Sequence, residues 1–95
     1  MVNVNDRFIE LGKKLVLDYT AEHLDKTDEI SIGMNDVYAV WVCKTLQHVK
    51  GLFSTTVSDG MYYELTYNGD KNELYFDAYK KWENKAIPVD LLKED

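Results

Sequence analysis

Residues 61–78 read Met61-Tyr-Tyr-Glu-Leu-Thr-Tyr-Asn-Gly-Asp-Lys-Asn-Glu-Leu-Tyr-Phe-Asp-Ala78, and this stretch decides the fold. It contains two runs in which apolar and polar residues alternate, separated by the turn sequence Asn68-Gly-Asp-Lys71. Alternation at every second residue is typical of a strand with one buried face. The stretch therefore predicts an antiparallel hairpin with strands over about 61–67 and 73–82.

The pairing of this hairpin follows from the faces that each loop length would create. With a four-residue loop over 68–71, Tyr63 pairs with Phe76, and the apolar residues share one face. A three-residue loop would mix the two faces. A two-residue loop keeps the faces but sets Glu64 against Glu73, and like charges directly opposite are destabilising. We therefore predict the four-residue loop.

The N-terminal part of the chain predicts a helix over about 6–24. Asn5 and Asp6 can cap its start. Apolar residues then recur with helical spacing, at Phe8, Leu11, Leu15 and Tyr19. Gly12 weakens a helix interior, so it is expected where the helix comes close to the sheet.

The middle of the chain predicts two further strands. The first, over about 36–46, is rich in β-branched and aromatic residues with little polar alternation, which is typical of a central strand covered on both faces for part of its length. Residues 47–50 are interpreted as a turn, and the second strand runs over about 51–57. Pro88 lacks a backbone N–H, so residues 86–92 can only extend an edge or leave the sheet.

Together these elements predict one α+β domain over residues 1–95, in which an N-terminal helix packs on a four-stranded antiparallel meander. A chain of this length makes one domain. Because one helix covers only one face of a sheet, the other face should remain open.

The net charge of −6 disfavours direct binding to nucleic acid or to an anionic membrane, because an acidic surface repels phosphates. The acids are concentrated in one segment, and a cluster of six forms a candidate partner-binding patch. This acidic patch comprises Asp18, Glu22, Asp25, Asp28, Glu29 and Asp36. It is either a solvated surface or a contact for a basic groove on a partner protein.

The solvent face of the predicted hairpin is a second candidate partner-binding surface, because tyrosines alternate there with charged residues. Its members are Tyr62, Glu64, Tyr75, Asp77 and Tyr79. Aromatic side chains are enriched in protein interfaces. Sheets also favour tyrosine for packing alone, and contact with a second copy is a further interpretation.

No residue pattern indicates a catalytic, metal or cofactor site. Cys43, His23 and His48 lack the spacing of a zinc site, and Cys43 is interpreted as a small buried apolar residue. Glu64 and Asp77 are expected to lie diagonally on an open face, where general acid–base chemistry has no desolvated cleft. We therefore expect a protein that is not an enzyme.

Compartment signals are also absent from the sequence. The N-terminus lacks the basic and apolar blocks of a signal peptide, and no apolar run approaches the about 20 residues that span a bilayer. One cysteine cannot form an internal disulfide. These features predict a cytoplasmic protein.

Residues 36–47, 52–57 and 59–84, with the helical segment 8–15, resemble an uncharacterised family of small proteins. Its members are encoded by bacteriophages and prophages of Gram-positive bacteria, in particular streptococci and their relatives. The resemblance covers nearly the whole chain, and the sequence departs from the family mainly after Ala86, where the tail is longer than expected. It implies an accessory gene product that acts in the cytoplasm of a bacterial host, and it assigns no activity to any residue.

This context favours a protein that binds and inhibits a host protein, most concretely an anti-defence inhibitor of the anti-CRISPR type. The partner would be a basic nucleic-acid-binding enzyme such as a CRISPR nuclease, because carboxylates compete for a DNA groove. A replication or recombination accessory that docks on another phage protein is an alternative, and a small enzyme is a third. The oligomeric state is open between a monomer and a homodimer.

Overall fold

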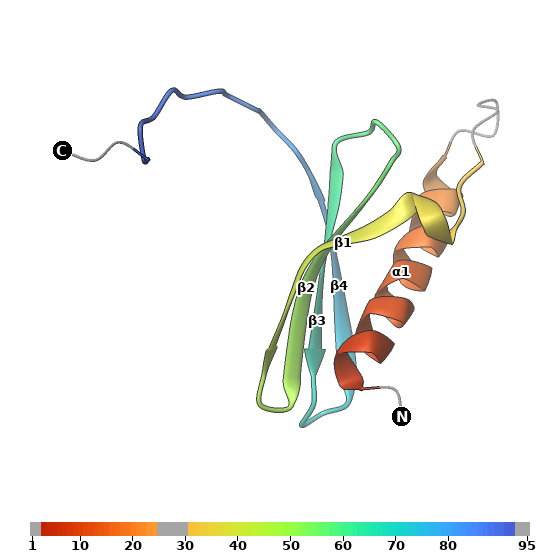
Figure 1. The fold of residues 1–95 in the computed structure, drawn as a ribbon. Helices are drawn as coiled ribbons and strands as arrows, with labels where there is room; N and C mark the ends of the chain where they lie inside the picture. Colours follow the sequence, from red (N-terminus) through yellow and green to blue (C-terminus); the bar gives the residue numbers. More distant parts are fainter. Residues whose placement is uncertain (1–2, 25–30, 93–95) are drawn as a thin grey trace.

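The computed structural model describes residues 3–24 and 31–92. Helix α1 (Val4–His23) and a short 3-10 helix, η1 (Met34–Asp36), precede one antiparallel sheet with strand order β1-β2-β3-β4 (Figure 1). The strands are β1 (Val37–Thr45), β2 (His48–Thr55), β3 (Met61–Asn68) and β4 (Glu73–Lys80). This arrangement confirms the α+β prediction of an N-terminal helix on a four-stranded antiparallel meander.

Helix α1 lies across one face of the sheet and contacts β1, β2 and β3 (Figure 1). Its buried residues are four apart, so they form one ridge along the helix. They are Phe8, Gly12, Val16 and Thr20. The predicted stripe was wrong at Leu11, which is 48% exposed, because the buried ridge runs through its neighbour Gly12.

Gly12 marks the closest approach of α1 to the sheet, as the sequence predicts. A Cβ atom at this position would lie 2.6 Å from Cζ of Phe53 and 3.1 Å from Cδ2 of Leu65. Contacts below 3.0 Å do not occur between a real Cβ and a ring carbon. The missing side chain therefore lets the helix backbone rest directly on β2 and β3.

The helix begins earlier than predicted because Asn3 provides its cap. The Asn3 side chain accepts a hydrogen bond from the backbone N–H of Asp6 at 2.8 Å. The candidate caps Asn5 and Asp6 lie inside the first turn instead. At the other end the helix stops at His23, one residue before the predicted end, and Leu24 has extended backbone.

The core lies between α1 and the inner face of the sheet, and β2 and β3 contribute most of it. Its buried apolar residues are Phe8, Val16, Val37, Val49, Phe53, Tyr63 and Leu65. Tyr63 is nearly fully buried, and its hydroxyl lies 3.4 Å from Oγ1 of Thr20. Burial raises the pKa of Tyr63, because the charged phenolate is disfavoured away from water.

The β3–β4 hairpin has a four-residue loop, but the predicted register was wrong by two residues. Asn68 pairs with Glu73, and Tyr63 faces Ala78 rather than Phe76. The Asn68 side chain accepts hydrogen bonds from the backbone N–H groups of Asp70 and Lys71, at 3.0 and 3.3 Å, and Asn72 adopts a positive φ of 52°. Because the shift is even, both faces keep their predicted residues.

Strand β1 is an edge strand, so its prediction as a central strand covered on both faces was wrong. It pairs with β2, and a bulge interrupts the pairing between Ala39 and Trp41. In a meander the first strand lies at an edge, and α1 covers only one face. The apolar run of β1 therefore exposes Val40 and Trp41.

Strand β2 begins three residues earlier than predicted and ends two earlier. The turn between β1 and β2 contains only Leu46 and Gln47, since Thr45 pairs with His48. Leu46 adopts a positive φ of 55°, which the sequence did not indicate because glycine and asparagine are the usual residues there. Lys50, assigned to a turn, lies within β2.

The segment after β4 leaves the sheet (Figure 1). Strand β4 ends at Lys80, two residues before the predicted end, and the Lys81 N–H makes a last hydrogen bond to the Gly60 carbonyl at 2.7 Å. Residues 81–92 are exposed and form no strand. Residues 86–92 therefore leave the sheet and do not extend its edge, which is one of the two arrangements that Pro88 allows.

Candidate functional site: the outer face of the sheet

The face of the sheet that points away from α1 is not covered by any described element (Figure 1). We call it the outer face. All four strands contribute to it through the residues that alternate with the buried ones. Its members are Tyr38, Trp41, Cys43, Lys50, Leu52, Tyr62, Glu64, Thr66, Tyr75, Asp77 and Tyr79.

Large aromatic side chains dominate the exposed area of this face. Tyr38, Trp41 and Tyr75 are each a little under half exposed, and Tyr79 is 52% exposed. All five residues of the predicted sheet-face site lie here, which includes the three predicted tyrosines. Tyr38 and Trp41 were missed, because residues 36–46 were interpreted as a central strand covered on both faces for part of its length.

The position of β1 in the chain is the signal that could have revealed these two residues. The first strand of a meander has a neighbour on one side only, and a single helix covers a single face. Alternate residues of β1 must then point to solvent, as Tyr38 and Trp41 do. The composition of the strand could not reveal this, because it is apolar on both faces.

The charges of the outer face are arranged in pairs across strands. Glu64 lies directly opposite Asp77, so the predicted diagonal arrangement was wrong as a result of the register shift. Two carboxylates in this position repel each other. Lys50 on β2 offsets this repulsion, because its Nζ lies 3.2 Å from Oε1 of Glu64.

Two tyrosines of this face also contact charged groups. The Tyr75 hydroxyl donates a hydrogen bond to Oε2 of Glu73 at 2.8 Å, and this bond raises the pKa of Tyr75 because the neutral phenol is the donor. Lys81 Nζ lies 5.5 Å from the ring centroid of Tyr62, within range of a cation–π contact. The outer face is thus an open aromatic surface whose charges are mostly held by neighbours.

The acidic patch is only partly within the described residues. Asp25, Asp28 and Glu29 lie outside them. Asp18 and Glu22 are exposed on α1. Asp36 has a role within the fold, since its carboxylate accepts hydrogen bonds from the Gly33 N–H at 2.8 Å and the Thr56 hydroxyl at 3.3 Å.

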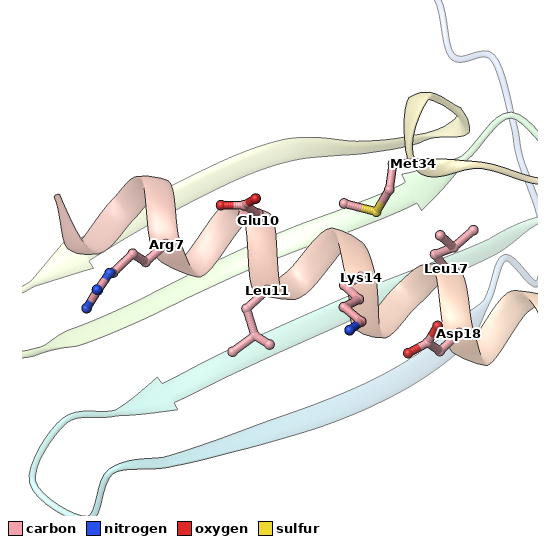
Figure 2. Close-up of a pocket in the computed structure, with 7 residues that line it drawn as sticks. All are labelled: Arg7, Glu10, Leu11, Lys14, Leu17, Asp18 and Met34. Carbon is pink, nitrogen blue, oxygen red and sulfur yellow. The ribbon is translucent and has the colours of Figure 1, made fainter. Parts of the chain in front are cut away.

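The exposed side of α1 near Asp18 does not carry acids alone. An open hollow of about 610 Å³ lies there, lined by six helix residues and Met34 of η1. Figure 2 shows that the charged side chains along it alternate in sign, in the order Arg7, Glu10, Lys14 and Asp18. Neighbouring charges of opposite sign cancel at a distance, so this side of α1 offers a partner no uniform field.

Cys43 is exposed on the outer face, so its interpretation as a buried apolar residue was wrong. Cys43 is exposed because it lies on the edge strand β1 and points to the face that α1 does not cover. His48 lies diagonally across from it, but both imidazole nitrogens face the β3–β4 turn. Nδ1 accepts from the Gly69 N–H at 3.2 Å, and Nε2 lies 3.7 Å from Asp70. The pair therefore lacks the contact by which a histidine activates a thiol.

His23 is also engaged locally, since its ring stacks on Tyr19 and its Nδ1 lies 2.8 Å from the Tyr19 carbonyl. Within residues 3–24 and 31–92, no three side chains of the types that bind metals come together. In the same ranges, no helix has the length and apolar character needed to cross a membrane.

The comparison with protein families gives one match. The model of a family of unknown function, DUF6275, matches residues 9–89, which include α1 from Ile9 onward and all four strands. No curated protein and no solved structure matches the chain. Because the match covers most of its length, the chain belongs to the DUF6275 family of unknown function.

Proposed function

We propose that this protein acts by binding another protein through the outer face of its sheet. The observation that supports the proposal is the contrast between the two faces of one sheet. The inner face is packed under α1, whereas the outer face leaves Tyr38, Trp41, Tyr75 and Tyr79 about half exposed. Tyrosine and tryptophan are the residues that most often dominate binding energy at protein interfaces.

The size of the face indicates how much of a partner it can contact. Four strands about 4.8 Å apart and about 26 Å long give a surface of about 500 Å². A standard interface buries about 800 Å² on each partner. The partner is therefore expected to reach beyond the face. The free edge of β1 lies beside Tyr38 and Trp41, and an added strand could pair with its backbone there.

The acidic patch is less well supported as the main contact, since Asp36 is engaged within the fold and basic residues lie near Asp18. The two surfaces predict different salt dependence. Binding through carboxylates weakens steeply as salt rises, whereas binding through buried aromatic rings changes little. We expect the second behaviour.

In its most specific form, the proposal is that this chain is a small phage accessory protein and that it inhibits a host defence protein such as a CRISPR nuclease. The resemblance to phage-encoded proteins and the net charge of −6 support this form. The partner surface would then be basic around an apolar centre, because it must match aromatic rings bordered by Glu64 and Asp77.

The experiment is affinity capture from a streptococcal lysate with the full chain as bait, followed by quantitative mass spectrometry. The wild-type chain is compared with the double variant Tyr75→Ala/Tyr79→Ala and with the matched control Asp18→Asn/Glu22→Gln. All four substituted positions are exposed, so both variants should fold, which circular dichroism checks.

We expect one protein to be enriched by the wild type and by the control variant, and to be lost with the tyrosine variant. Truncation of two exposed aromatic side chains of this face should weaken binding by roughly 30-fold or more. Loss with the Asp18/Glu22 variant, and retention with the tyrosine variant, would assign binding to the acidic patch instead.

A further inference from the structure

The segment after β4 carries more exposed apolar surface than any other part of the described chain. We call residues 81–92 the arm. Its large apolar residues are Trp82, Ile87, Val89, Leu91 and Leu92, and they range from 71 to 97% exposed. Single exposed apolar residues are ordinary on a protein surface, but a continuous apolar segment marks a contact that is still to be made.

An apolar groove lies at the opposite end of the molecule, between the start of α1 and the β1–β2 and β3–β4 turns. We call it the end groove, and its volume is about 840 Å³. Its apolar lining consists of Val4, Phe8, Leu11, Leu46, Tyr67 and Leu74. Val4 and Leu11 are about half exposed and Leu46 is 77% exposed, so the groove is open to a ligand.

The charges of the end groove distinguish it from the rest of this acidic protein. Among the described residues that line it, the charged ones are Arg7 and Lys44, both basic. Asp70 of the adjacent turn does not line the groove, and its carboxylate contacts Gln47 Nε2 and lies 3.7 Å from His48 Nε2. A fitting occupant is therefore apolar with an acidic group, which describes Val89-Asp90-Leu91-Leu92.

The position of the arm favours a groove on another molecule. The arm leaves the sheet where the Lys81 N–H donates a hydrogen bond to the Gly60 carbonyl. The end groove lies at the other end of the sheet, beside the β1–β2 and β3–β4 turns (Figure 1). Strand β4 separates them by eight residues, or about 26 Å. To reach its own groove, the arm would have to reverse and run back along all of β4.

We propose that the arm binds in the end groove of a second copy of this chain, and that two copies exchange arms about a two-fold axis. Leu91 and Leu92 fill the apolar floor of the partner's groove, and Asp90 lies against its basic rim. Such an exchange closes on itself, so it stops at a dimer. It leaves the outer face of both copies free, so this inference goes beyond the proposed function.

The test is sedimentation equilibrium of the full chain over a range of concentrations. We expect a reversible monomer–dimer equilibrium for the wild type. Leu91→Asp should raise the dimer Kd at least about 30-fold, because it places a carboxylate in an apolar groove. Tyr79→Asp is the matched control on the outer face, and it should leave the Kd within about twofold. Both residues are exposed in the single copy, so both variants should keep the wild-type fold.

A charge exchange tests the groove itself. Arg7→Glu and Asp90→Arg should each raise the Kd by about fivefold, and the double variant should restore it, because the ion pair is rebuilt with its signs reversed. A wild-type chain that stays monomeric up to about 1 mM would overturn the proposal. So would a dimer unaffected by Leu91→Asp, or a monomer that Leu91→Asp destabilises, which would place the arm in its own groove.

Discussion

The two faces of the sheet are built from similar residues but have opposite surroundings. On the inner face, Phe53, Tyr63 and Leu65 are almost fully buried beneath α1. On the outer face, Trp41, Tyr75 and Tyr79 remain about half exposed. Residue type therefore does not tell the two faces apart. The difference follows from α1, which covers only one face, so the inner face stabilises the fold and the outer face stays exposed.

The largest expected effect on the free energy of unfolding comes from Phe53, which is compared with its neighbour Leu52 on the opposite face of β2. Phe53→Ala should lower the free energy of unfolding by about 3–5 kcal/mol, because it opens a cavity under α1. Leu52→Ala on the outer face should cost at most about 1 kcal/mol, since Leu52 is only partly buried. Urea unfolding measures both, and equal losses would mean that the outer face is also packed.

The close approach at Gly12 gives the next largest effect. Gly12→Ala adds a Cβ only 2.6 Å from the Phe53 ring, and we expect a net loss of about 1–3 kcal/mol in unfolding free energy. This would be notable because alanine is otherwise the better helix former by about 1 kcal/mol. Glu10→Ala, on the exposed side of α1, is the control and should change little. A stabilised Gly12→Ala variant would show that α1 sits further from the sheet.

Asn3→Ala should have a smaller effect, about 1 kcal/mol, because the backbone N–H of Asp6 loses the side chain that accepts its hydrogen bond. Thermal unfolding followed by circular dichroism measures it. Asn5→Ala serves as the matched control, since the structure places the cap at Asn3 and not at the position predicted from the sequence. Equal losses for the two variants would contradict the observed helix start.

The smallest effect concerns alkaline pH. Burial raises the pKa of Tyr63, so as pH rises the unfolded state loses the Tyr63 proton before the folded state does. The stabilising contribution is fully present below the ordinary tyrosine pKa of about 10 and is lost as pH rises through the folded value. Tyr63→Phe should flatten the fall in unfolding free energy above pH 10. Tyr79→Phe on the outer face is the control, and an equally flat profile for it would contradict this assignment.

The sequence predicted the fold well because its strongest signals are local. The alternation over 61–78 located the hairpin and sorted its two faces, and Gly12 correctly marked the approach of helix to sheet. The register could not be predicted from the faces, because a shift by two residues preserves them. It depends on Asn68 and Asn72, whose turn conformations lie beyond the alternation pattern.

The candidate site was predicted in part. The tyrosines of the β3–β4 hairpin were found, since their alternation with apolar residues is plain in the sequence. Trp41 and Tyr38 were missed because β1 is apolar on both sides, and only the order of strands shows that one side faces solvent. The end groove could not be predicted either, because it joins residues from α1 and two separate turns.

The most direct test of an open outer face uses Cys43, the single cysteine, which lies exposed on that face. The rate of its reaction with a thiol reagent is measured in the native protein and in denaturant. An open face predicts complete labelling of the native protein at a rate within about tenfold of that in denaturant. A native Cys43 that reacts only after unfolding would show that the face is covered, and it would contradict the account.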